Sequence, residues 1–165
     1  MASAVLDSGP LIHLAEIRCF RALRIAEVVV PVAVASEVTR SNKPGSQELK
    51  DSELPVIELT EDEKVLAKQL CHRYGIEVGE AEAITLCISR RYDLFLTDDA
   101  EARDVGEVYH LEVHGTAGIV ARAYHQGLLS HEETKRAMQD LYETSSLYMT
   151  QRVYKLVLEM IEKTS

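Results

Sequence analysis

Acidic residues in this sequence lie where short apolar segments end or within predicted helices: Asp7, Glu37, Glu80, Asp98 and Asp99. Carboxylates that converge cannot all stay ionised unless cations lie between them. Their oxygens are hard ligands that select Mg²⁺ or Mn²⁺. Such ions activate water and stabilise the leaving oxygen in phosphodiester hydrolysis. If these acids meet, the pattern predicts metal-dependent cleavage of a phosphodiester.

Glu80 supports this prediction most strongly, because its helical pattern places it among apolar residues. At about 100° per residue, Ala83, Ile84 and Cys87 lie within about 60° of Glu80, whereas Glu82 lies about 200° away. A charged side chain in a core-facing stripe costs free energy unless another group compensates it. We therefore expect Glu80 to point toward a site and Glu82 to face solvent.

Each acid also has an interpretation that involves no site. Asp7, Asp98 and Asp99 precede helical patterns, where an Asp serves as an N-cap that accepts bonds from free backbone N–H groups. Glu80 lies near a helix start and interacts favourably with the helix dipole there. Glu37 lies at the edge of its apolar stripe and is placed to pair with Arg40.

The composition is that of a folded, acidic globular chain. The 165 residues include 27 Asp or Glu and 18 Lys or Arg, which gives a formal net charge of −9, and 46% of residues are hydrophobic. This length suits a single domain over residues 1–165. The acidic balance argues against a nucleic-acid binder that acts through charge alone. The lack of Trp, with only two Phe, argues against an aromatic base-stacking platform.

Strands and helices are expected to alternate along the chain. The predicted strands are 4–6, 27–30, 55–59, 93–97 and 108–113. The predicted helices are 11–23 with a break near Arg18, 31–40, 60–74, 79–91, 99–104, 116–125, 131–142 and 149–161. Thr60 and Glu63 predict a capping box at one helix start, and Gly75 predicts the end of that helix. The polar segment 41–53 has no apolar period and predicts a mobile surface loop.

Alternating strands and helices predict βαβ units and an α/β fold with a mainly parallel central sheet, covered by helices on both faces. The uninterrupted apolar segment 94–96 is typical of a strand that is buried on both faces. In such folds ligands bind outside the carboxyl ends of the strands. Asp7 and Asp98 occupy such positions.

Four short motifs, in this order, resemble the acidic motifs of PIN domains. They are segments 5–8, 31–38, 79–84 and 96–103, which hold the acids described above. The 18-residue step from Glu80 to Asp98 also resembles the family's spacing. Segments 115–119 and 127–129 are similar to one prokaryotic branch of the family, the VapC-type toxins.

The resemblance implies a three-layer α/β/α fold and a ribonuclease that uses Mg²⁺ or Mn²⁺ to cut single-stranded RNA. By position, the catalytic, metal-binding carboxylates carried over are Asp7, Glu37, Glu80 and Asp98, with Asp99 as the alternative to Asp98. Ser8 and Thr97 match neighbouring hydroxyl positions that orient a carboxylate or water. Many relatives are homodimers and toxins of toxin–antitoxin pairs, which implies a second copy and a small antitoxin protein as partners.

Basic residues supply the candidate contacts to RNA phosphates: Arg18, Arg21, Arg40 and Lys43. Arg18 and Arg21 lie three residues apart, and the alternative is that they belong to a solvated helix face. The predicted helix from about residue 147 has one apolar side, which must cover its own domain or a partner.

We expect a cytoplasmic protein, because no segment approaches the roughly 20 apolar residues of a membrane span and no signal peptide is visible. The main alternative function is a non-catalytic PIN-like nucleic-acid-binding or scaffold module whose acids only contact partners. A phospho-acceptor signalling domain would need a Lys at a late strand end, and Val113-His114 provides none.

Overall fold

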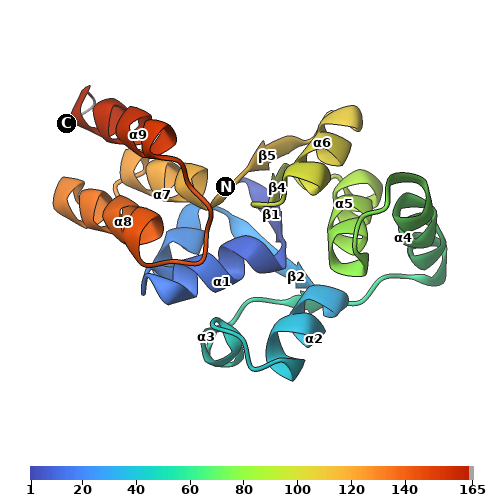
Figure 1. Cartoon of the computed structure of the whole chain (residues 1–165). Coiled ribbons are helices and arrows are strands. Elements are labelled where there is room, and N and C mark those ends of the chain that lie inside the picture. The colour runs from blue at the N-terminus through green and yellow to red at the C-terminus, as the bar shows by residue number, and fades with distance from the viewer. Residues whose placement is uncertain (164–165) are drawn as a thin grey trace.

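The computed structural model describes residues 1–163 and contains a five-stranded parallel sheet (Figure 1). The strand order is β3-β2-β1-β4-β5. The strands are β1 (Ser3–Leu6), β2 (Glu27–Pro31), β3 (Val56–Ile57), β4 (Leu94–Leu96) and β5 (Glu112–His114). β1 lies at the centre, where Leu6 pairs with Leu96 of β4 and Val5 pairs with Val29 of β2.

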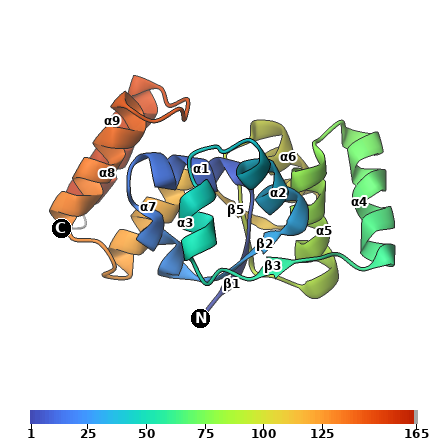
Figure 2. The same cartoon turned by 90° about the horizontal axis from the view of Figure 1, so that it is seen from below.

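Helices connect these strands and cover both faces of the sheet (Figure 2). They are α1 (Ser8–Glu16), a 3₁₀ helix (Phe20–Ile25), α2 (Val32–Arg40), α3 (Ser46–Asp51), α4 (Glu61–Tyr74), α5 (Val78–Arg90), α6 (Ala100–Val108), α7 (Thr116–His125), α8 (His131–Glu143) and α9 (Gln151–Lys163). The break predicted near Arg18 is confirmed, because α1 ends before it and the 3₁₀ helix begins after it.

The two faces of the sheet bury separate hydrophobic cores. Successive strand residues point to opposite faces, so Ala4 and Leu6 pack under α1, α7 and α8, whereas Val5 packs with α4, α5 and α6. β4 alternates in the same way, with Phe95 facing the second core. Both faces are therefore buried, and the predicted three-layer α/β/α arrangement with a parallel sheet is confirmed.

Local sequence signals set the ends of α4. The Thr60 side chain accepts a bond from the Glu63 backbone N–H, and the Glu63 carboxylate accepts one from the Thr60 N–H, which completes the predicted capping box. Gly75 ends the helix with φ at 69°, a conformation that glycine adopts without steric cost. Both predicted signals are confirmed.

Segment 41–53 is not the open loop that its composition predicts. It contains α3, whose Leu49 is buried in the core, and Ser46 is buried as well. Gly45 precedes this helix with φ at 98°, and its carbonyl accepts a bond from the Leu49 N–H. A helix of six residues with one buried leucine has no repeating apolar pattern, and this is why the sequence did not reveal it.

The strand predicted over 108–113 is also wrong in its position. α6 continues to Val108, and β5 begins only at Glu112. Between them the chain turns at His110, whose φ is 61°. The sequence predicted that the β-branched Val108 lies in a strand, whereas this residue ends α6. The buried Gly106 allows α6 to pack closely against Phe95 and Val113.

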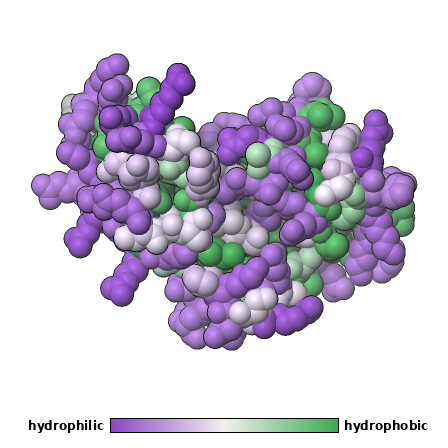
Figure 3. Space-filling view, in the orientation of Figure 1, coloured by the Kyte–Doolittle hydropathy of each residue, from purple (hydrophilic) through white to green (hydrophobic). Residues whose placement is uncertain are grey.

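α8 and α9 lie at one end of the molecule and α4 lies at the other in both views (Figures 1 and 2). The rings of Tyr154 of α9 and Tyr142 of α8 stack with centroids 4.5 Å apart, and Ile161 is buried. The face seen in Figure 3 is mainly hydrophilic, with apolar side chains in small patches. No helix within residues 1–163 is long and apolar enough to cross a membrane.

Candidate active site

Asp7 lies at the carboxyl end of β1 and is 4% exposed. Its Oδ1 accepts a bond from the Ser8 backbone N–H at 2.8 Å, and its Oδ2 accepts one from the Thr97 hydroxyl at 2.7 Å. Burial raises the pKa of Asp7 to about 6, with smaller contributions from the charges of Glu37 and Asp99. Thr97 follows the neighbouring strand β4, so the pairing of β1 with β4 fixes the orientation of this carboxylate.

Glu80 lies in the first turn of α5 and is 8% exposed. Its Oε1 accepts a bond from the Glu77 backbone N–H at 2.9 Å, so it also completes a capping box at this helix start. Burial raises the pKa of Glu80 to about 8, and the charges of Asp7, Asp99 and Glu77 add to the increase. The helix-start interpretation therefore holds, and the same carboxyl is buried beside other acids.

The two adjacent aspartates after β4 make different contacts. Asp98 accepts bonds from the backbone N–H and the hydroxyl of Thr116, at 2.7 and 2.5 Å, and its Oδ2 lies 2.6 Å from Nδ1 of His13. Asp99 is exposed, caps α6 through the Ala102 N–H at 2.8 Å, and raises the pKa of both Asp7 and Glu80. Of these two aspartates, Asp99 is the one whose charge is among the causes that raise the pKa of both buried carboxyls.

Glu37 lies at the periphery of this group. It forms an ion pair with Lys43 at 3.1 Å, and its charge contributes to the raised pKa of Asp7. It faces the start of α5, where a Cβ added to Gly79 would lie 3.8 Å from Oε2 of Glu37. Lys43, considered above for RNA phosphates, is therefore engaged by an acid, whereas Arg40 is exposed.

Asp7, Glu80, Asp98 and Asp99 share a cleft of about 380 Å³ at the carboxyl ends of β1 and β4, and Glu37 does not line it. The residues that line it are Asp7, Ser8, Gly9, His13, Glu77, Glu80, Asp98, Asp99, Ser146, Leu147 and Tyr148. Within residues 1–163, no Lys or Arg side chain lines this cleft. Its net charge is strongly negative, so a bound cation would be stabilised in it.

The donor chemistry of the cleft fits a hard divalent cation. Asp7, Glu80 and Asp99 each offer carboxylate oxygens, and in the described chain no hydrogen bond reaches the second oxygen of Glu80 or Asp99. However, no three His, Cys, Asp or Glu side chains within residues 1–163 are placed so that they could hold a metal ion as they stand. Binding an ion therefore requires these side chains to move closer together.

His13, Thr116 and the segment 146–148 belong to the site, although no pattern in the sequence indicated them. His13 lies between apolar residues of α1, which favoured a packing role, yet its ring contacts Asp98. Thr116 begins the helix after the last strand of the sheet, and that position was the available signal. Segment 146–148 is more than 45 residues distant in sequence from Asp99, and nothing in its composition indicates the cleft.

The helical position of Glu82 predicted that its side chain faces solvent, but the structure shows it in contact with α2. Its Oε1 accepts a bond from the Ala33 backbone N–H at 3.1 Å, at the first turn of α2. The side of α5 opposite the core is covered here by α2, so the expectation of a solvated residue was wrong. Glu82 is a partly buried cap for a neighbouring helix.

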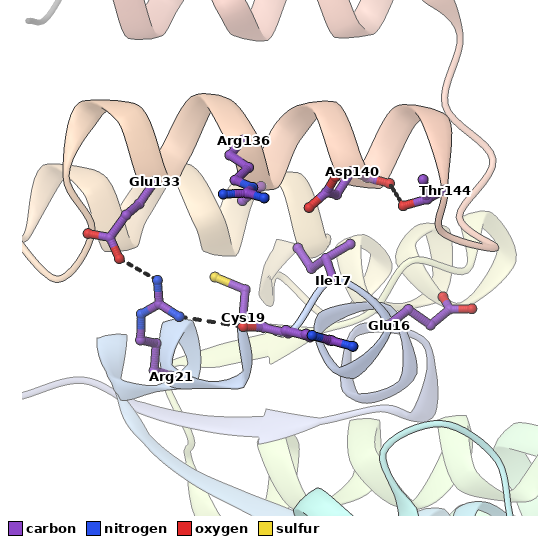
Figure 4. A pocket seen from close by; sticks show the side chains of 10 residues that line it. Glu16, Ile17, Cys19, Arg21, Glu133, Arg136, Asp140 and Thr144 are labelled. Carbon is purple, nitrogen blue, oxygen red and sulfur yellow. Dashed lines mark hydrogen bonds and ion pairs between the residues drawn. The ribbon is translucent and has the colours of Figure 1, made fainter.

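Arg18 and Arg21 lie beyond the end of α1, whereas Asp7 lies before its start. Figure 4 shows the Arg21 guanidinium directed toward Glu133 of α8, with which it forms an ion pair. Both arginines line a separate cavity of about 510 Å³ between α1 and α8, together with Cys19 and Arg136. They do not line the carboxylate cleft.

Comparison with known proteins agrees with this architecture. A family model described as PIN domain matches residues 3–163, and the chain belongs to the PIN-domain family. PIN domains are generally nucleases that use divalent metals, so the family supports a nuclease-type fold and nucleic acid as the class of ligand. A search of curated proteins found no match.

Proposed function

We propose that this protein is a divalent-metal-dependent ribonuclease that hydrolyses phosphodiester bonds of single-stranded RNA. The observation that carries the proposal is the pair of buried carboxyls, Asp7 and Glu80, whose pKa values are raised to about 6 and about 8 in a cleft with Asp99. Acids buried together without a cationic side chain destabilise the fold unless a ligand compensates them. A divalent cation is the ligand that their oxygens favour.

In this proposal Asp7, Glu80 and Asp99 hold Mg²⁺ or Mn²⁺, and Glu37 contributes from the periphery. The ion supplies an activated water and stabilises the leaving oxygen. Thr97 and the Ser8 N–H keep Asp7 in one orientation. Asp98 is a positioning residue, because it joins His13 of α1 to Thr116 of α7 and so holds two sides of the cleft together.

The test is cleavage of an unstructured, end-labelled RNA by pure protein with Mn²⁺ or Mg²⁺ and then with excess chelator. We expect cleavage with either ion, none with chelator, and less on the same RNA annealed to its complement. Asp7→Asn should abolish cleavage, and calorimetry should show weaker Mn²⁺ binding by this variant. Cleavage that persists in chelator would exclude the metal mechanism. A folded protein that binds RNA but never cuts it would favour the alternative, a non-catalytic binding module.

We further propose that the protein acts in the cytoplasm as the toxin of a toxin–antitoxin pair. The support is the resemblance of segments 115–119 and 127–129 to the VapC-type branch. In that arrangement a small gene next to this one encodes the antitoxin. Co-expression of that gene product should suppress RNA cleavage and copurify with the nuclease. We also propose that residues 1–165 function as one domain, since both cores share one sheet.

A further inference from the structure

The segment that connects α8 to α9 lines one edge of the carboxylate cleft through residues 146–148 and is held in place on both sides of Tyr148. The backbone N–H and the hydroxyl of Ser146 both donate to Oε1 of Glu16, at 3.0 and 2.8 Å. Leu147 and Met149 pack against the first hydrophobic core. This connection, residues 144–150, is therefore anchored to α1 and to the core, and Tyr148 has a defined position.

Tyr148 itself projects into solvent at the edge of the cleft. Its side chain is 88% exposed, whereas the other six tyrosines are at least partly buried. Leu147 and Met149 on either side of it pack against the core, whereas the Tyr148 ring between them faces outward. In the described chain no hydrogen bond or ring contact reaches it. An aromatic ring held outside the core in this way is available to a ligand.

Tyr148 lies at the boundary of two adjoining depressions. One is the carboxylate cleft, and the other is a depression of about 470 Å³ that Asp98, Arg103, His114 and Gly115 line with Tyr148 and Met149. Arg103 donates to the carbonyl of Thr97 at 3.5 Å, so its cationic group lies beside the carboxyl end of β4. A strand of RNA that leaves the acidic cleft over Tyr148 reaches a cationic side chain.

We infer that Tyr148 stacks on a nucleobase next to the phosphodiester that is cut and so positions single-stranded RNA. The inference rests on the proposed function and adds the element that holds the substrate's base. A ring suits this task because stacking requires a π-face and no charge. It can therefore bind a base beside a cleft whose acids repel phosphates. The scarcity of Trp and Phe excludes a platform of several rings, but one ring suffices for one base. A base in a duplex is already stacked on both faces, so this contact favours single strands.

The first measurement is RNA binding in the Asp7→Asn background, which prevents cleavage. The probe is an unstructured fluorescein-labelled oligoribonucleotide that contains 2-aminopurine. We expect Tyr148→Ala to weaken binding about tenfold, since a stack worth about 1.4 kcal/mol corresponds to that factor. The quenching of 2-aminopurine on binding should be lost as well. Tyr148→Phe retains the ring and should restore both signals.

Val65→Ala is the matched control, because Val65 is 56% exposed on α4 and lines neither the cleft nor the depression beside it. It should bind as the parent does. In the active protein with Mn²⁺, Tyr148→Ala should raise KM about tenfold and change kcat little, whereas a merely structural effect would lower the melting temperature of the protein as well.

The outcomes separate this inference from the proposed function. Binding by Tyr148→Ala within twofold of the parent, with quenching unchanged, overturns the inference and leaves the nuclease proposal intact. A parent that binds RNA with Tyr148-dependent quenching but never cuts it overturns the nuclease proposal and supports the stacking contact. A parent that neither binds nor cuts RNA overturns both.

Discussion

Asp98 and Asp99 are neighbours in the sequence, yet one is enclosed by protein groups and the other is exposed. Asp98 accepts three contacts, from His13 and from two groups of Thr116, and a Cβ added to Gly115 would lie 2.8 Å from it. The Asp99 side chain accepts one hydrogen bond, and its charge raises the pKa of both buried carboxyls. The two residues therefore have separable effects on stability and on metal binding.

The substitutions Asp99→Asn and Asp98→Asn test that separation. Asparagine caps helices as well as aspartate does, so Asp99→Asn should leave the free energy of unfolding within about 0.5 kcal/mol of the parent and weaken Mn²⁺ binding. Asp98→Asn loses acceptors for His13 and Thr116 and should cost about 1–3 kcal/mol. Thermal unfolding in chelator and calorimetric Mn²⁺ titration measure the two effects. Loss of Mn²⁺ binding by Asp98→Asn with normal stability would reverse the assignment.

Glu80→Gln and Glu82→Gln form a second matched pair. The raised pKa of Glu80 means that its charge destabilises the metal-free fold above about pH 4.5, and increasingly so until about pH 8. Glu80→Gln should therefore raise the melting temperature in chelator at pH 8. It should also remove part of the stability that the metal-free parent gains as the pH is lowered, and it should abolish RNA cleavage.

Glu82→Gln should keep the bond from Ala33 and lose only the favourable charge at the start of α2, no more than about 1 kcal/mol. Its cleavage should remain near normal. Normal cleavage by Glu80→Gln together with inactive Glu82→Gln would show that Glu82 is the residue in the site.

The sequence predicted the acids better than their partners. Asp7 and Glu80 were recognisable because a strand end and an apolar helical stripe are local patterns. The choice between Asp98 and Asp99 depended on Thr116 and His13, which lie 18 and 85 residues from Asp98. Contacts across such distances depend on how helices dock, which no local periodicity records.

Among the helices, α4 is joined to α5 by a buried acid outside the cleft. Glu63 accepts two bonds from Arg90 and one from Ser89. The bonds from Arg90 are the largest cause that lowers the pKa of Glu63 to about 2. This contact stabilises the pair of helices that covers the second core.

A lowered pKa gives Glu63 a defined effect on acid stability. Its contribution, roughly 2 kcal/mol, is complete above the unfolded pKa near 4.5 and is lost as the pH falls toward 2. Glu63→Gln should therefore lower the melting temperature at pH 7, and the difference from the parent should shrink below pH 4. Glu61→Gln is the control, since Glu61 is an exposed acid in the same helical turn. If the melting temperatures of Glu63→Gln and the parent differed by a constant amount down to pH 2, the ionised Glu63 carboxylate would not be the cause of the difference.

Helix ends were predictable wherever a side chain or a glycine determines the local backbone. The Thr60 capping box and the Gly75 terminus depend only on neighbouring residues, and both were found. α3 was missed because its formation depends on burial of Leu49 against distant parts of the core. The shift of β5 to Glu112–His114 has the same origin, since pairing with β4 selects its register.

For the whole molecule, α9 exposes apolar side chains along one side. Ile161 is buried against the domain, whereas Val153, Leu156 and Met160 are 44%, 51% and 59% exposed. We propose that this side contacts a second copy of the chain. Light scattering at micromolar concentration should give about 37 kDa, twice the 18.5 kDa of one chain.

Leu156→Glu places a charge in this apolar side and should give monomers of normal secondary structure. Val65→Glu, on α4 at the opposite end of the molecule, should remain dimeric. A parent that scatters as a monomer across the whole concentration range would refute the dimer.

The central strand comes from the first six residues, and the edge of the cleft comes from residues 146–148, so the cleft is complete only after residue 148 has been added. A ribosome that adds about 5–20 residues each second needs roughly 2–10 s to pass from Asp99 to Tyr148. During this interval the nascent chain carries the acids without Tyr148 or α9. Under the proposed function, the nascent chain therefore binds RNA, including the messenger that is being translated, more weakly until Tyr148 has been added.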